Sequence, residues 1–370
     1  MESLVSSWTK ELDGRAATAT LRQQQGTRNK VDFCSNDYLG LARNDAFQAR
    51  LLAVAQQEPA ALTGASGSRI IRGHADAVAE VEQHIAYTHG NASALLVGSG
   101  YLANLALFSC LLKRGDSILL DEKIHRSVHD GCKLSMATKW KFRHNDLTHL
   151  ESCLRKAKGR VLVAVESLYS MDGDFAPLED IITLANRYGA AVIVDEAHAA
   201  GVFGCGVVHQ KGLQEQVLAT VVTYGKAFGL AGAAILGSKL LTDYLLNFSA
   251  PLIYTTGLPI YHATAIRTAY GFLADNPSLA LSLQNLLARF AQQGMKTTSA
   301  AVSPIQSVRF SDSTCLLAAT AVMQQNGLDV YPIFPPTVAV GAERLRICMH
   351  TFNTPSEIDL LGKYIRAWQQ

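Results

Sequence analysis

Short apolar runs alternate with amphipathic segments between residues 93 and 236. Buried apolar strands separated by helices form a mostly parallel sheet with helices on both faces. The sequence therefore predicts an α/β fold in which ligands bind at the carboxyl ends of the strands. We expect strands at 94–97, 117–120, 139–142, 161–165, 191–194, 218–222 and 233–236, and helices near 101–113, 126–135, 147–157 and 178–188.

The pattern changes after Pro251, where longer helices and weaker strands predict a smaller α+β domain. No internal repeat or low-complexity linker interrupts the chain, so its parts are expected to form one rigid unit. We predict an N-terminal segment (1–44) that packs with the small domain, a large domain (45–250) and the small C-terminal domain (251–370). The small domain is expected to contain helices at 260–274, 279–293 and 355–368 and strands near 305–310, 329–333 and 345–348.

Composition narrows the classes of function. The chain has 370 residues, 48% of them hydrophobic and 17% charged, which suits an enzyme that buries further surface in an oligomer. A net charge of +2 without a basic run argues against a nucleic-acid partner. The seven cysteines form no CxxC pair, and no stretch of 18 apolar residues occurs. We therefore expect a cytoplasmic protein with reduced thiols, no metal site and no membrane partner.

One lysine between glycines, Lys226, follows the predicted strand 218–222. Earlier in the chain, Asp195 closes the strand 191–194, and His198 comes three residues later. Taken alone, such a lysine is more often a surface residue, and such an aspartate more often caps the next helix. In this order they match the needs of pyridoxal phosphate. The lysine holds the aldehyde as a Schiff base, and the carboxylate keeps the pyridine nitrogen protonated.

Three further features fall at the same predicted edge of the sheet. Residues 98–104 follow a strand and open a helix, where backbone N–H groups favour a phosphate, although an ordinary strand–helix turn reads the same way. His125 follows the next strand and could stack on a planar cofactor and donate a proton, although a lone histidine is usually structural. Ser170 follows the strand 161–165 and offers a hydroxyl.

Several motifs occur together along the chain. They are Ser-Asn-Asp-Tyr-Leu-Gly-Leu (35–41), Gly-Tyr-x-Ala-Asn (100–104), His-Asn-Asp (144–146), Ser-Met-Asp-Gly-Asp (170–174), Asp-Glu-Ala-His (195–198), Gly-Lys-Ala-Phe-Gly (225–229), Pro-Pro-Thr-Val (335–338) and Arg-Leu-Arg (344–346). With them the chain resembles the α-oxoamine synthases, pyridoxal-phosphate enzymes of fold type I, which share the aspartate aminotransferase-like fold. The resemblance covers nearly the whole chain.

The resemblance implies a role for each matching residue. Lys226 forms the Schiff base and moves the α-proton, Asp195 holds the pyridine nitrogen, and His125 stacks on the ring and polarises the acyl carbonyl. His198 and Ser170 position the ring oxygen. The implied cofactor-binding set is Gly100, Tyr101, Asn104, His125, Ser170, Asp195, His198, Thr223, Lys226, Thr255 and Thr256, with Thr255 or Thr256 supplied by the other subunit of a homodimer. The implied substrate-binding set is Arg22 for the acyl chain, His125, Thr337 and, for the amino-acid carboxylate, Arg346.

Within the family, the resemblance favours the decarboxylative condensation of L-alanine with pimeloyl-CoA or pimeloyl-acyl carrier protein. The products would be 8-amino-7-oxononanoate, free coenzyme A or carrier protein, and CO₂, in biotin synthesis. Small-molecule substrates and a second copy of the chain are the expected partners, and acyl carrier protein is a further candidate. Two alternatives stay open: another α-oxoamine synthase such as a glycine C-acetyltransferase, and a different fold-type I enzyme such as an aminotransferase or cysteine desulfurase.

Three positions depart from the family pattern. Phe334 stands where an arginine is usual, Ala339 replaces a proline, and Val78 falls where a histidine is usual. An arginine near the substrate entrance could bind an acyl-chain carboxylate or order the loop. Because Phe334 lacks that donor, the motifs define the reaction more closely than they define the acyl substrate.

Overall fold

The computed structural model describes residues 2–17, 21, 24 and 30–369. Its largest unit is a seven-stranded sheet with the strand order β2-β8-β7-β6-β5-β3-β4. The strands are β2 (Ser93–Val97), β3 (Ser117–Asp121), β4 (Thr138–Phe142), β5 (Val161–Glu166), β6 (Ala191–Asp195), β7 (Ala219–Thr223) and β8 (Ala233–Gly237). In the described sheet β8 pairs antiparallel with both β2 and β7, and the other four pairs are parallel, so the predicted mostly parallel sheet is confirmed.

Helices cover both faces of this sheet because successive strand side chains point to opposite sides. Ile118 and Leu120 of β3 pack in one apolar cluster with helices α4 (Gly100–Cys110) and α5 (Arg126–Leu134). Leu119 points the other way, into a second cluster with α6 (Leu147–Lys156) and α7 (Leu178–Arg187). The four helices predicted in this region are therefore present, each within a few residues of its expected bounds.

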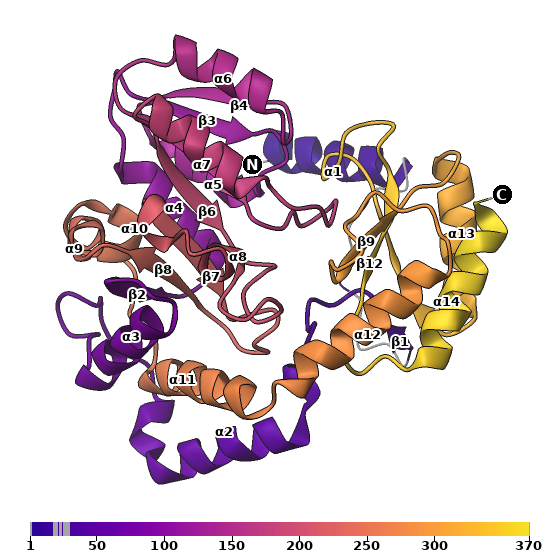
Figure 1. The fold of residues 1–370 in the computed structure, drawn as a ribbon, viewed down its shortest axis with the longest axis horizontal. Helices are drawn as coiled ribbons and strands as arrows, with labels where there is room; N and C mark the ends of the chain where they lie inside the picture. Colours follow the sequence, from indigo (N-terminus) through magenta and orange to yellow (C-terminus); the bar gives the residue numbers. More distant parts are fainter. Residues whose placement is uncertain (1, 18–20, 22–23, 25–29, 370) are drawn as a thin grey trace.

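The C-terminal part has its own antiparallel sheet with the order β11-β12-β9. Its strands are β9 (Ile305–Val308), β11 (Tyr331–Ile333) and β12 (Arg344–Cys348), and its helices are α12 (Ser278–Gln292), α13 (Ser313–Gln325) and α14 (Pro355–Trp368). Figure 1 shows this sheet and its helices beside the large sheet. Helix α13 and, in the large part, α3 (Asp76–Thr88) and α9 (Lys239–Phe248) were not among the elements expected from the sequence.

Two contacts connect the predicted parts of the chain. Strand β1 (Val31–Asp32) pairs in parallel with β10 (Leu328–Asp329), which joins the N-terminal segment to the C-terminal part. Helix α11 (Ile260–Asp275) instead lies against α3 and α2 (Asp45–Gln57), as the lower part of Figure 1 shows. The division into residues 1–44, 45–250 and 251–370 stays a prediction. Within the described residues, no helix has both the length and the apolarity that a membrane span requires.

Gly173 marks a close approach between the large sheet's loops and the C-terminal sheet. It has a φ of +67°, and an added Cβ would lie 2.1 Å from the carbonyl oxygen of Ile305. Gly189 has nearly the same φ, +65°, but nothing lies within 4 Å of its added Cβ. We predict that Gly189→Ala costs about 1–2 kcal/mol for the left-handed backbone alone. Gly173→Ala should cost about 1–3 kcal/mol more, because the backbone of β9 must shift.

Thermal unfolding of both variants measures this difference. Equal melting temperatures for the two variants would show that the approach of Gly173 to Ile305 does not constrain the fold.

Candidate active site

A cavity of about 410 Å³ opens where the carboxyl ends of the central parallel strands meet. The sheet register aligns Glu166 at the end of β5 with Asp195 at the end of β6. Thr223 ends the next strand, β7, and the loop after it carries Lys226. Of the residues predicted from the sequence, those that line the cavity are Gly100, Tyr101, Asn104, His125, Asp195, His198, Thr223 and Lys226.

The Lys226 amine lies on the wall of this cavity, with Nζ 2.9 Å from Nε2 of His198. Burial disfavours the charged ammonium, and the nearby carboxylates of Asp195 and Glu166 only partly offset this effect. The pKa of Lys226 is therefore lowered to about 8. A substantial neutral fraction near physiological pH is what a lysine needs to act as nucleophile or base.

Asp195 is buried and held by two donors. Its Oδ2 accepts a hydrogen bond from Nδ2 of Asn104 at 2.8 Å, and its Oδ1 accepts from the backbone N–H of Ala197 at 2.9 Å. These bonds fix the direction of the carboxylate toward the cavity. Asn104, expected to bind the cofactor, thus also orients Asp195, and its own Oδ1 has no hydrogen-bond partner among the described residues.

His198 has a tautomer that its neighbours determine. Tyr38 Oη donates to Oδ1 of Asn36 at 3.0 Å, so the 2.7 Å contact between Tyr38 Oη and His198 Nδ1 requires the hydrogen on Nδ1. Nε2 is then free to accept from Lys226. Burial and the adjacent lysine lower the pKa of His198 well below its ordinary value, which keeps the ring neutral.

Sequence reasoning assigned no role to Tyr38, Asn36 or Glu166. The first two lie in the motif at 35–41, which was noted only for its resemblance. Glu166 is buried beside Asp195, and its Oε2 accepts from the backbone N–H of Ser170 at 3.0 Å. Burial and the Asp195 charge raise the pKa of Glu166, and its Oε1 has no hydrogen-bond partner among the described residues.

His125 is ordered by the start of helix α5. Asn104 Nδ2 donates to Ser127 Oγ at 2.9 Å, and the Ser127 backbone N–H donates to Nδ1 of His125 at 3.3 Å. Nδ1 is therefore the acceptor, also for the Ser127 hydroxyl at 2.8 Å, and Nε2 carries the hydrogen. Burial lowers the pKa of His125, although Asp195 opposes this. A neutral imidazole with a free Nε2–H can donate to a ligand oxygen.

The start of helix α4 forms one end of the cavity. An added Cβ on Gly100 would lie 2.5 Å from Cγ2 of Thr223, so only glycine lets the helix start approach β7 this closely. Ser99 caps the helix by accepting from the Leu102 N–H at 3.2 Å. Backbone N–H groups at such a helix start bind phosphate. Tyr101 is exposed and donates to Oδ2 of Asp130 at 2.6 Å.

Arg346 is a buried cation that forms no ion pair with any carboxylate in the described part of the chain. Its Nε donates to the carbonyl oxygen of Ser170 at 2.6 Å, and Nη2 donates to Oδ1 of Asn36 at 2.9 Å. Asn36 in turn lines the cavity. Because a buried charge without a counter-ion is costly, an anion bound next to Arg346 would be strongly favoured.

Three predicted threonines do not line the cavity. Thr255 Oγ1 donates to the Pro251 carbonyl oxygen at 2.6 Å, and the exposed Thr256 forms an isolated bridge with Ser68. Thr337 is exposed on the loop between β11 and β12, and Arg22 lies outside the described residues. Ser170 contacts the site through its backbone. The roles assigned to these side chains stay predictions.

The donor set fits pyridoxal phosphate. A helix start can hold a phosphate, a buried oriented carboxylate can accept from a pyridinium N–H, and a lysine of lowered pKa can react with an aldehyde. Asn104 and Glu166 line the cavity and each has a buried oxygen without a hydrogen-bond partner among the described residues, which is consistent with a polar ligand at this site.

We predict that Lys226 of the cofactor-free protein reacts with an acylating reagent with a midpoint near pH 8, since only the neutral amine reacts. In Asp195→Asn the midpoint should move to lower pH, because the lost carboxylate had favoured the ammonium. Asp243→Asn, on the exposed face of α9, should leave it unchanged. Mass spectrometry of the labelled peptide gives the midpoint, and a value of 10 or above in wild type would contradict the lowered pKa.

Comparison with known proteins identifies the family of this chain. Residues 28–363 match the family described as aminotransferase class I and II. The 8-amino-7-oxononanoate synthase of Emericella nidulans is 39% identical over 92% of this chain and 90% of its own length. That of Chromobacterium violaceum is 37% identical over 95% and 94%.

Two solved structures are also similar to this chain over nearly its whole length. Serine palmitoyltransferase from S. paucimobilis has a TM-score of 0.84 at 26% identity over 99% of this chain and 97% of its own. The 8-amino-7-oxononanoate synthase of Francisella tularensis has a TM-score of 0.78 at 26% identity over 91% and 97%. The chain therefore belongs to the class I and II aminotransferase family, and within it to the 8-amino-7-oxononanoate synthases, which are pyridoxal-phosphate-dependent acyltransferases of the α-oxoamine synthase group.

Proposed function

We propose that this protein condenses L-alanine with a pimeloyl thioester and releases CO₂ and a free thiol, giving 8-amino-7-oxononanoate for biotin synthesis. The observation that carries the proposal is that Lys226 and Asp195 line one cavity, in a chain with relatives of that name. Arg346, which forms no ion pair among the described residues, donates to Asn36 on the wall of the same cavity. The thiol is that of coenzyme A or of an acyl carrier protein. A biosynthetic role of this kind fits the expected cytoplasmic location.

The cofactor supplies an electron-accepting ring that makes the amino acid's α-hydrogen acidic. Asp195, held by Asn104 and the Ala197 N–H, would accept from the ring nitrogen of the bound cofactor. Lys226 donates a hydrogen to His198 Nε2, which leaves its lone pair to take the α-proton. Lowering the pKa of this amine toward the working pH is what general-base catalysis requires.

Arg346 and His125 handle the two substrates. The guanidinium of Arg346 binds the alanine carboxylate, which becomes the counter-ion that the described residues do not supply to this buried charge. His125 donates from Nε2 to the carbonyl oxygen of the thioester and so stabilises the charge that develops there as the carbon–carbon bond forms.

A homodimer is part of the proposal. Two loops come together where Thr256 bridges Ser68, and the Gly257 N–H donates to the Gly67 carbonyl oxygen at 3.0 Å. Ile71 and Tyr254 on these loops are 86% and 85% exposed, which is unusual for large apolar side chains and supports an interface there. A second copy on this face would carry Thr255 and Thr256 toward the neighbouring cavity.

The direct test is product analysis. With L-alanine and pimeloyl-CoA, the wild-type protein should form 8-amino-7-oxononanoate and free thiol. Lys226→Ala should lower turnover at least about 10³-fold at an unchanged melting temperature, because the side chain contributes chemistry and little packing. Substantial turnover in Lys226→Ala would contradict its role. Faster reaction of glycine with acetyl-CoA would favour a glycine C-acetyltransferase, and amino transfer without thiol release would favour an aminotransferase.

Phe334 is expected to act through packing rather than acyl selection. Its ring is partly buried and packs against the apolar cluster of the C-terminal part, and its carbonyl oxygen accepts from the Thr337 N–H at 3.1 Å. We predict that Phe334→Arg lowers the melting temperature but changes the ratio of kcat/KM for pimeloyl-CoA over heptanoyl-CoA less than threefold. Val340→Arg, at a position 87% exposed on the same loop, is the matched control.

A tenfold shift of this ratio in Phe334→Arg alone, about 1.4 kcal/mol of transition-state discrimination, would instead make Phe334 a specificity residue.

A further inference from the structure

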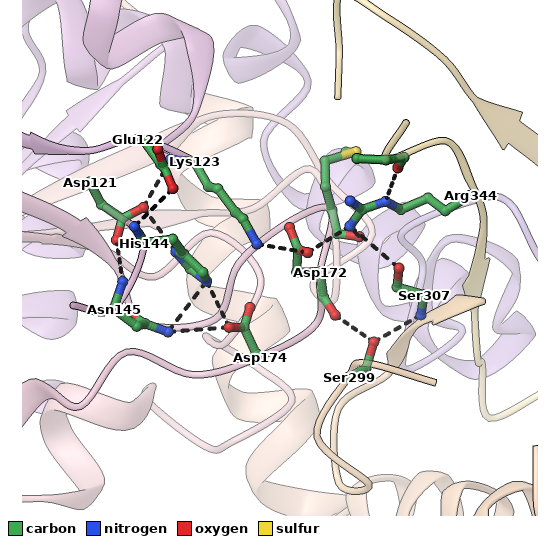
Figure 2. Close-up of polar contacts among 12 residues, drawn as sticks. Asp121, Glu122, Lys123, His144, Asn145, Asp172, Asp174, Ser299, Ser307 and Arg344 are labelled. Atoms are coloured by element: carbon green, nitrogen blue, oxygen red, sulfur yellow. Dashed lines mark hydrogen bonds and ion pairs between the residues drawn. The ribbon is translucent and has the colours of Figure 1, made fainter. Parts of the chain in front are cut away.

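Three family motifs have side chains that the proposed chemistry does not use: His144 and Asn145, Asp172 and Asp174, and Arg344. The structure brings these side chains into one polar network outside the cavity (Figure 2). The network joins the ends of β3 and β4, the loop after β5, and strand β12 of the C-terminal sheet. It therefore spans the boundary between the large sheet and the strand that carries Arg346.

Asp172 is the centre of the network. Its Oδ1 lies 2.6 Å from Nη1 of Arg344 and 2.9 Å from Nζ of Lys123, and Figure 2 shows the two cations approaching from opposite sides. The side chains of Asp172 and Arg344 are only 8% and 3% exposed. Although burial opposes ionisation, the bonds from Lys123 and Arg344 hold the pKa of Asp172 below its ordinary value. Asp172 is thus a buried anion shared by two cations.

His144 fixes the same loop from its other side. Its Nδ1 donates to Asp121 Oδ1 at 2.9 Å and its Nε2 donates to Asp174 Oδ2 at 2.7 Å. Asn145 adds bonds to the same two carboxylates, at 3.0 Å from its backbone N–H and 3.2 Å from Nδ2. Despite burial, the two carboxylates raise the pKa of His144 to about 9, so the ring is an imidazolium. Among the described residues, His144 and Asn145 form no hydrogen bond or ion pair with β12.

Asp172 and the candidate site are linked through strand β12. Arg344 and Arg346 are two residues apart on β12 and therefore point to the same face of the strand. Arg344 meets Asp172, and Arg346 meets the carbonyl oxygen of Ser170, which is two residues from Asp172. A shift of the Arg344–Asp172 contact would consequently move Arg346 relative to Ser170 and Asn36.

We propose that Asp172 is a positioning residue for substrate binding, which by pairing with Arg344 and Lys123 sets where the Arg346 guanidinium stands. The inference rests on the proposed role of Arg346 in binding the alanine carboxylate. If this is so, loss of the Asp172 charge lowers the affinity for the substrate carboxylate as well as the stability of the folded protein.

The experiment compares two ligands of the cofactor-loaded enzyme, L-alanine and L-alaninol, which differ in the carboxylate alone. Dissociation constants are measured from the change in cofactor absorbance. In Asp172→Asn, binding of L-alanine should weaken at least tenfold and that of L-alaninol less than twofold, and KM for alanine should change more than kcat. Asp174→Asn is the matched control, because it loosens the same loop through His144 without touching β12. It should lower the melting temperature and leave the ligand ratio unchanged.

The outcomes separate this inference from the proposed function. If Arg346→Gln weakens L-alanine selectively and Asp172→Asn does not, the positioning role is overturned and the proposed function stands. If Arg346→Gln leaves L-alanine binding unchanged, the proposed carboxylate site itself fails. If Asp172→Asn does not fold, the ratio of the L-alanine and L-alaninol dissociation constants is measured in Arg344→Lys instead. It keeps the cation but not the planar fork, so it should shift the ratio at least threefold, and an unchanged ratio overturns the proposal.

Discussion

The site depends on the register of the parallel strands. Pairing of β5 with β6 sets Glu166 directly beside Asp195, which buries two carboxylates at one edge of the sheet. Burial, and next to it the like charge of Asp195, raise the pKa of Glu166. The two carboxylates also face Lys226 and favour its ammonium against burial. The protonation states of Glu166 and Lys226 thus depend on the strand pairing that places these side chains together.

Strand β12 holds two buried arginines with different surroundings. Arg344 has its charge matched by Asp172, whereas in the described part of the chain Arg346 donates to neutral acceptors, among them Ser170, Asn36 and the Cys348 thiol. The first arrangement resembles a closed ion pair, which favours one geometry of the strand. The second leaves a positive charge that a ligand can match. Structural and binding roles are therefore divided between neighbouring positions of one short strand.

Much of the fold could be predicted because its apolar runs are short and regular. The direction of β8 could not, since an apolar strand reads the same in both directions. Helix α13 was missed because small and apolar residues occupy nearly all its positions and leave no polar face. Motifs identified Lys226 and Asp195, but the Tyr38–His198 bond joins residues 160 positions apart, which no local pattern reveals.

The strand order also affects how the chain folds during its translation. Within the described sheet, edge strand β2 pairs only with β8, whose Gly237 lies opposite Ser93 although it is synthesised much later. At a synthesis rate of roughly 5–20 residues per second, an apolar strand waits on the order of 10 seconds or more on the ribosome without its partner. Such a strand can aggregate in that interval. Slower translation before β8 should therefore increase the demand of the nascent chain for chaperones.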